Sequence, residues 1–329
     1  IFENWGSPFF LTVLVTISLI WLYTFRGGIK TIIWTDTLQT FFMLLALIIS
    51  VYLIGKDLGL DYANIIPFIS ESEYSKIFFW EGDKHFFRRF FTGAFIAIVM
   101  TGLDQDMMQK NLSCKNIKEA QKNMVYFSIS LIFVNLMFLC LGALLYSIAG
   151  KYDIQYLKPD DLFPAVVLSE TLGFPIIIIF ILGLIAAAYS SADSALTSLT
   201  TSFSIDILNI NIKDRGSIII RKYVHLIFSV IIFLVIILLD IINDQSIISA
   251  IFSVAGYTYG PLLGLYFFGL FTSYKVNDKL VPYLAIFAPV LSYLIQLYFS
   301  VGFEILLVNA LIVCAGLFII KKDDLALEV

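Results

Sequence analysis

The sequence predicts an all-α polytopic membrane protein. Charged residues make up 14% of the 329 residues and hydrophobic residues 60%, and the mean hydropathy is +0.92. A soluble domain of this length needs far more charge to cover its surface. The hydrophobic residues also gather in runs of about 20, the length that a helix needs to cross the hydrocarbon core.

Nine apolar runs are the expected transmembrane helices. They lie at about 9–25, 32–53, 90–106, 124–148, 174–206, 223–240, 247–271, 281–300 and 304–320. The fifth run is longer than a bilayer requires, so it must tilt or extend beyond the membrane. The third turns polar early, in the sequence MTGLDQDMMQK.

The basic residues predict the orientation. One set of loops carries fourteen Lys and Arg residues and the opposite set seven, so none of them lies inside a run. By the positive-inside rule the richer set faces the cytoplasm. The first run then passes from outside to inside, and the C-terminus is cytoplasmic.

The fifth run carries an unusual number of polar residues. Its polar side chains fall within about three helical turns, and they are Ser190, Ser191, Asp193, Ser194, Thr197, Ser198 and Thr201. At 100° per residue, most of their oxygens share a face about 120° wide, with Asp193 and Ser191 at its edges.

Asp36 and Asp193 are the acids that fall clearly inside the runs. An Asp at bilayer depth costs roughly 2.5–3.5 kcal/mol on insertion scales, so each is a functional candidate. With no basic residue inside a run, each acid must be protonated, hydrogen-bonded in a wet cavity, or paired with a bound cation.

The hydroxyl-rich face has two interpretations. Ser and Thr in membrane helices often bond their own backbone or join neighbouring helices. Six hydroxyls beside an acid favour instead a site for a hard cation. Because His and Cys are missing from this stretch, we expect sodium as the bound ion and no transition metal.

Other polar positions leave alternatives open. Gly260 and Pro261 indicate a helix that bends, either so that Tyr257 and Tyr259 line or gate a cavity or as a structural kink alone. Asp104 and Gln105 either cap a helix or form an inner gate with Lys110. The other positions of note are single residues: His85 and His225 are expected at the membrane interface, and the three Cys show no disulfide spacing.

Three motifs, in this order, carry a family resemblance. GGIKTIIWTDTLQ (27–39), GLDQDMMQKNLSCKNIKEAQK (102–122) and SSADSALTSLTTSFSIDI (190–207) together resemble the sodium:solute symporter family, which includes sodium–glucose, proline, pantothenate and sialic acid transporters. The resemblance implies a LeuT-like fold of two inverted five-helix repeats, with substrate and ion near the midplane.

The resemblance also implies a domain organisation. Residues 1–329 would form a single transmembrane transporter domain that is N-terminally incomplete. The fourth and fifth core helices would lie at about 9–53, the second repeat at about 90–271, and two trailing helices at about 281–320. The start at Ile1 and the predicted orientation agree with missing upstream helices.

The same resemblance implies ligands for sodium. In the main site, Ala187 would give a carbonyl, and Ser190 and Ser191 would give hydroxyls. Some members have a second cation site, for which Asp36, Asp193 and Ser194 are the candidates here. Asp193 stands where some members have a small residue, and it would either strengthen that site or be a proton-linked group.

Solute recognition is expected elsewhere in the fold. Ala97 and Met100 stand where sugar transporters have polar and aromatic residues, which argues against a hexose. Ser253 and Tyr257 are candidate pocket residues, and Asp104 and Gln105 are candidate gate residues.

The function expected from the resemblance is sodium-coupled symport, importing a small organic solute by alternating access. The alternatives are a membrane-embedded solute sensor of the same fold, a proton-coupled transporter and a channel. An enzyme is disfavoured because the loops show no nucleophile–base pair or metal cluster. We expect the cell membrane as location, the lipid bilayer and a small-molecule solute as partners, no nucleic acid, and no obligate protein partner.

Overall fold

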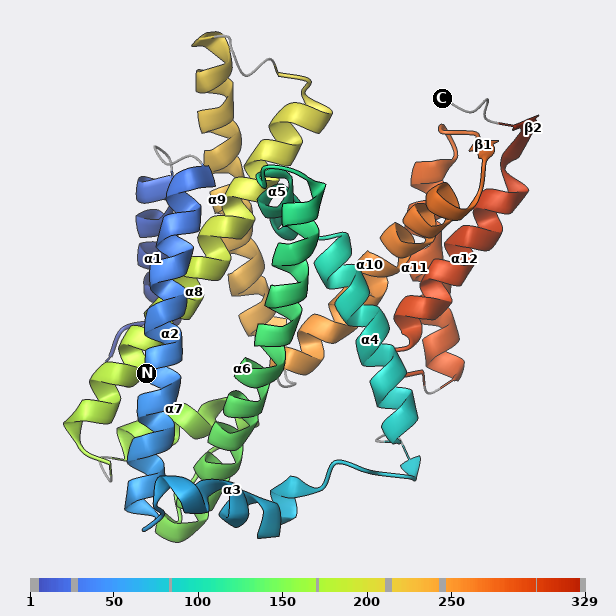
Figure 1. Ribbon diagram of the computed structural model, residues 1–329. Coiled ribbons are helices and arrows are strands. Elements are labelled where there is room, and N and C mark those ends of the chain that lie inside the picture. The colour runs from blue at the N-terminus through green and yellow to red at the C-terminus, as the bar shows by residue number, and fades with distance from the viewer. Residues whose placement is uncertain are drawn as a thin grey trace. The chain divides into compact units, whose positions relative to one another are not determined.

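The computed structural model describes residues 6–24, 29–82, 85–169, 172–210, 215–242, 247–299 and 301–325, and these are almost entirely helical (Figure 1). The chain divides into two compact units, residues 1–75 with 109–244 and residues 76–108 with 245–329, each with its own hydrophobic core. Some residues used above lie outside the described ranges: Ile1, Gly27 and Gly28 of the first motif, and three of the basic residues counted for the orientation, Arg26, Lys84 and Lys213.

The first unit is built from helices of very different lengths. They are α1 (Phe9–Thr24), α2 (Ile29–Asp57), α3 (Tyr62–Glu71), α6 (Ile117–Tyr152), α7 (Leu162–Leu168), α8 (Phe174–Ser202) and α9 (Arg215–Ile242). A π-helical turn, η4 (Phe203–Ile207), continues α8, and η1 (Glu73–Ser75) and η3 (Pro159–Asp161) are short 3-10 turns.

The second unit contains four longer helices and a small sheet. The helices are α4 (Phe86–Gly102), α10 (Ile247–Phe271), α11 (Val281–Tyr298) and α12 (Ile305–Ile319). Strands β1 (Tyr274–Val276) and β2 (Lys321–Leu325) pair antiparallel. The short helix α5 (Gln105–Leu112) follows α4 in the chain.

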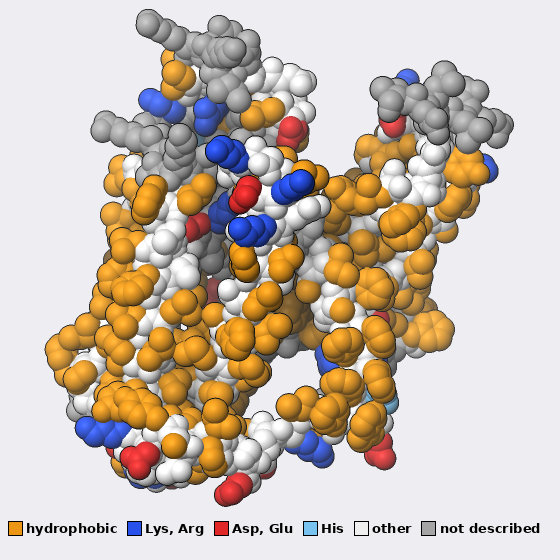
Figure 2. Space-filling model, viewed as in Figure 1, with side chains coloured by type: hydrophobic (Ala, Val, Ile, Leu, Met, Phe, Trp, Pro, Cys, Tyr) orange, Lys and Arg blue, Asp and Glu red, His pale blue; other side chains and the backbone are white. Residues whose placement is uncertain are grey.

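The predicted apolar runs correspond to these helices. Six described helices are long and apolar enough to cross a membrane, and the bent pair α4–α5 makes a seventh if it is one span. The remaining two runs form the shorter apolar helices α1 and α12. Hydrophobic side chains cover most of the surface visible in Figure 2, as lipid contact requires. The chain is therefore a multi-pass membrane protein.

The third predicted run, 90–106, is not one continuous helix, because α4 ends at Gly102 and α5 begins at Gln105. The chain bends by 54° between α4 and α5. The break has a local cause: the Asp104 Oδ1 atom accepts the backbone N–H groups of Asp106 (2.9 Å) and Met107 (3.3 Å) and so caps a new helix. Of the two roles left open for Asp104, the structure shows the cap.

Close packing of α2 against α8 forms the centre of the first unit. A Cβ atom on Gly183 would lie 2.7 Å from the Cβ atom of Ala46, so only glycine permits this approach. Below this point, Leu47 and Ile54 of α2 join a buried cluster with residues of α6, α7 and α8. The small residues Gly183 and Ala46 thus allow α2 and α8 to pack closely.

His225 is buried between helices, and its position at the membrane interface stays a prediction. Its Nε2 atom lies 2.9 Å from the Thr24 hydroxyl of α1, and its Nδ1 atom lies 3.0 Å from the Thr200 hydroxyl of α8. The side chain is satisfied on both ring nitrogens, so burial carries little penalty. It joins α1, α8 and α9.

In the second unit, a glycine row on α10 lies against α12. A Cβ atom on Gly260 would be 2.5 Å from the Cβ atom of Asn309, and one on Gly264 would be 2.6 Å from a backbone oxygen of α12. Pro261 lacks the N–H that would normally bond the Tyr257 carbonyl one turn earlier. Asn309, fully buried on α12, donates from Nδ2 to that carbonyl at 3.0 Å. The Asn309 side chain thereby replaces the hydrogen-bond donor that the proline lacks.

Candidate functional site

The polar face of α8 and the start of α2 meet at Asp36. The Ser190 hydroxyl donates to Asp36 Oδ1 at 2.8 Å, and the Ser194 hydroxyl donates to Asp36 Oδ2 at 3.2 Å. The two serines are four residues apart, so they lie one turn apart on the same face. The structure thus joins Asp36 with Ser190 and Ser194, which the sequence suggested as neighbours.

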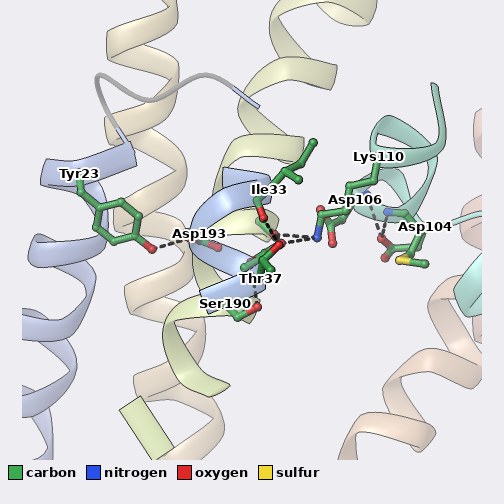
Figure 3. A network of polar contacts seen from close by, with 11 residues as sticks. Tyr23, Ile33, Thr37, Asp104, Asp106, Lys110, Ser190 and Asp193 are labelled. Carbon is green, nitrogen blue, oxygen red and sulfur yellow. Dashed lines mark hydrogen bonds and ion pairs between the residues drawn. The ribbon is translucent and has the colours of Figure 1, made fainter. Parts of the chain in front are cut away.

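Lys110 supplies a positive charge to this cluster (Figure 3). Its Nζ atom lies 2.8 Å from Asp36 Oδ2 and donates to the Ser194 hydroxyl at 3.0 Å. The neighbouring Gln109 donates to the Ser198 carbonyl at 3.2 Å. The expectation that no basic side chain neutralises Asp36 was wrong, because the long lysine side chain reaches the acid from outside the apolar runs.

Asp193 points in another direction. It is fully buried, and its Oδ2 atom accepts the Tyr23 hydroxyl of α1 at 2.5 Å (Figure 3). The Tyr189 ring stacks on the Tyr23 ring, with centroids 6.2 Å apart. The three candidates for a second cation site therefore divide into Asp36 with Ser194, and Asp193 with Tyr23.

The main sodium-site candidates begin about one turn before these residues, toward the N-terminus of α8. Ala187 is half-buried and lines an apolar cavity of about 170 Å³ with Gly183, Leu47 and Phe180. Ser191 is exposed in this chain. The i, i+3, i+4 spacing places the Ser190 and Ser191 hydroxyls near the Ala187 carbonyl, which is the arrangement that the resemblance implies.

Asp104 and Gln105 belong to the second unit. Besides capping α5, Asp104 accepts the Tyr259 hydroxyl of α10 at its Oδ2 atom, 3.1 Å away. Gln105 is the exposed first residue of α5. Their role as a gate stays a prediction.

The solute-pocket candidates have different environments within the second unit. Ala97 is exposed on α4, whereas Met100 packs against the buried cluster formed by Ile96, Val99 and Leu306. On α10, the Ser253 hydroxyl bonds its own helix at the Ser249 carbonyl, 2.8 Å away. The Tyr257 hydroxyl donates to the Gln296 side chain of α11.

Sequence reasoning missed two contacts of these clusters. Tyr23 was not singled out because it lies in an apolar run, and Lys110 was considered as a gate residue but not as the partner of Asp36. The sequence gives little indication of these contacts, because each one joins helices that are far apart in the chain. Among the described residues, no group of three or more His, Cys, Asp or Glu side chains is suited to hold a metal ion.

The comparisons with known proteins all point to one family of sodium-coupled transporters. Residues 1–279 match the sodium:solute symporter family. The chain is 25% identical over 308 residues to the sodium/sialic acid symporter NanT of Aliivibrio fischeri, covering 87% of this chain and 58% of that protein. It is 24% identical over 281 residues to the human sodium-coupled monocarboxylate transporter 2, covering 82% and 44%. It is 24% identical over 289 residues to the human sodium/iodide cotransporter, covering 81% and 43%.

A solved structure has the same fold. It is a sodium-coupled sialic acid symporter in a substrate-bound, outward-open state, and it superposes with a TM-score of 0.74 at 18% identity, covering 98% of this chain and 69% of that one. The predicted LeuT-like transporter fold is therefore confirmed. The chain spans about half the length of the curated relatives it matches.

Proposed function

The chain belongs to the sodium:solute symporter family, and from this premise we propose that it forms part of a sodium-coupled symporter that imports a small organic solute. Sodium and solute bind together in one conformation and are released in the other. The ion drives this cycle only through its different affinity for the two states.

The observation that carries the proposal is the oxygen-rich face of α8. Ala187, Ser190 and Ser191 are assigned to the main sodium ion. A backbone carbonyl and two hydroxyls are neutral oxygen ligands, and such ligands suit a hard cation. Of the two hydroxyls, that of Ser191 is the more accessible to an ion, because Ser191 is exposed and Ser190 already donates to Asp36.

The solute is assigned to the face of α4 and α10 that carries Ala97, Met100, Ser253 and Tyr257. The relatives reported above are named for sialic acid, monocarboxylates and iodide, which are all anions at neutral pH. A screen therefore begins with sialic acid and short monocarboxylates, with a hexose as the comparison solute. Asp104 and Gln105 are proposed to line the inner exit.

The cell membrane is the proposed location, with the C-terminus in the cytoplasm. The excess of basic residues in one set of loops supports this orientation. Cysteine labelling from each side of sealed cells, at a single cysteine introduced near Lys321 in an otherwise cysteine-free protein, tests it. Labelling only after permeabilisation agrees with the proposal, and labelling of intact cells contradicts it.

The first experiment compares thermal unfolding of the intact purified protein in sodium chloride and in choline chloride at equal ionic strength. A ligand that binds only the folded state stabilises it by about 2.7 kcal/mol at a hundredfold excess over its Kd. Ser191→Ala should remove most of the sodium-specific rise in Tm. An unchanged Tm in sodium for the intact protein would contradict sodium coupling.

Solute uptake into proteoliposomes then separates the remaining alternatives. Accumulation that requires an inward sodium gradient supports symport. Accumulation driven by a pH gradient alone indicates proton coupling. Binding without accumulation indicates a sensor, and sodium flux that is independent of solute indicates a channel.

A further inference from the structure

We propose that Asp36 is a positioning residue for the main sodium ion. It accepts the hydroxyl proton of Ser190 and so leaves the Ser190 oxygen and the Ala187 carbonyl free for the ion. The inference rests on the proposed sodium coupling and adds to it a residue that acts on a ligand and does not bind the ion itself.

A serine hydroxyl binds a cation through a lone pair of its oxygen, so its single proton must point elsewhere. In membrane helices this proton commonly goes to a carbonyl three or four residues earlier in the same helix. For Ser190 those carbonyls belong to Ala187 and Ala186, and the first of them is assigned to sodium. One lone pair of the Ala187 carbonyl already faces the helical N–H four residues later. A bond from Ser190 would occupy the other lone pair and block the ion.

The Ser190 hydroxyl avoids its own helix. Further along α8, Ser198 shows the ordinary arrangement, because its hydroxyl donates to the Ala195 carbonyl at 3.0 Å. The Ser190 hydroxyl instead donates across to α2, to Asp36 Oδ1 at 2.8 Å (Figure 3). The acceptor on α2 therefore keeps the Ser190 proton away from the carbonyls of α8.

The Asp36 carboxylate is itself held in place. Its Oδ2 atom accepts the Ser194 hydroxyl at 3.2 Å and lies 2.8 Å from the Lys110 ammonium. The ammonium also donates to the Ser194 oxygen at 3.0 Å, which closes a triangle around Oδ2. These contacts fix the orientation of the carboxylate and direct Oδ1 to Ser190.

The charge of Lys110 favours this indirect role for Asp36. A sodium ion bound directly to the carboxylate would be repelled by the ammonium on the same oxygen. A group that accepts a proton from a ligand instead orients that ligand and makes its oxygen a better donor of electrons to the ion. Asp36 can do this while it stays paired with Lys110.

The test is the sodium affinity of the intact purified protein, measured with radioactive sodium together with the number of ions bound at saturation. Asp36→Leu combined with Lys110→Met removes the acid and its ammonium as a unit. We expect the Kd for sodium to rise about tenfold, the equivalent of one hydrogen bond, with the number of bound ions unchanged. Ser198→Ala removes a hydroxyl that bonds its own helix, so it is the matched control and should leave the Kd unchanged.

Two further variants separate positioning from a general structural effect. Ser190→Ala removes the group on which Asp36 is proposed to act. Adding Asp36→Leu and Lys110→Met to it should then change the Kd by less than about twofold. Asp36→Asn combined with Lys110→Met keeps an uncharged acceptor for the Ser190 proton and should bring the Kd to within about threefold of the wild type. The Tm of each variant in choline chloride reports its stability separately.

The opposite results would overturn the inference. An unchanged Kd after Asp36→Leu with Lys110→Met would show that Ser190 needs no acceptor on α2. A full further loss on the Ser190→Ala background would show that Asp36 acts by another route, and a count lower by one ion would make Asp36 a ligand. A wild type that binds no sodium would refute the proposed function as well. If the variant with Asp36→Leu does not fold, the variant with Asp36→Asn decides: recovered affinity supports the inference, and a lost ion contradicts it.

Discussion

Removing the Lys110 charge should destabilise the protein through Asp36. Lys110→Met keeps the length of the side chain and leaves the carboxylate without its ammonium. Exposed ion pairs contribute about 0–1 kcal/mol, and breaking a fully buried pair costs about 3–5 kcal/mol. The two side chains here are 28% and 17% exposed, between these limits. We therefore expect a loss of about 2 kcal/mol in the free energy of unfolding.

A double-mutant cycle isolates the pair. Thermal unfolding of the wild type, Lys110→Met, Asp36→Asn and the double variant gives the coupling energy, which we expect to be about 1–2 kcal/mol. Lys118→Met, which removes an exposed positive charge on α6, is the matched control and should change little. If the two single effects simply add, the contact contributes nothing and the reasoning about Asp36 fails.

Salt gives an independent check on the same pair. Mobile ions screen exposed charges more strongly than partly buried ones. The coupling of Lys110 and Asp36 should therefore persist in about 1 M choline chloride, where the Debye length is about 3 Å. The more exposed pair of Lys151 with Asp57 should lose its coupling under the same conditions. Equal loss in both pairs would mean that Asp36 is as solvated as a surface acid.

Three other substitutions test the packing, all by thermal unfolding in one detergent. Asn309→Ala leaves the Tyr257 carbonyl buried without a donor and should cost about 1–3 kcal/mol; a neutral result would mean that water replaces the amide. Gly264→Ala should cost about 1–3 kcal/mol, because its Cβ atom would lie 2.6 Å from a backbone oxygen of α12; an unchanged Tm would show that the two helices separate freely. Thr200→Val removes one partner of buried His225 and should cost about 1 kcal/mol, and a gain in Tm would contradict the assigned hydrogen bond.

The sequence predicts the helices well because hydrophobicity in a bilayer leaves few alternatives. Each apolar run became a helix, since a lipid-exposed backbone must satisfy its own hydrogen bonds. The break between α4 and α5 was placed inside a predicted run. Its cause is the N-terminal cap that Asp104 makes on α5. The sequence did not predict the break, because an Asp at this position can equally cap a helix or line a gate.

The partners of the polar residues were much harder to predict. Helical periodicity correctly placed Ser190 and Ser194 on one face, and Asp36 was correctly singled out. Periodicity carries no information about which helix faces that side, so it missed that Lys110 reaches Asp36 and that Tyr23 reaches Asp193. Such pairings depend on contacts between helices far apart in sequence, which a single sequence does not specify.

The repair of Pro261 by Asn309 has a consequence for the order of synthesis. When α10 leaves the ribosome, its Tyr257 carbonyl has no donor and its glycine row has no covering helix. Both deficits last until α12 has been made, and α12 follows only after α11 has been inserted. In this interval the translocon or an insertion chaperone would have to cover this face of α10. A ribosome that stalls between the two helices would leave a segment that is already in the membrane but not yet able to hold its final shape.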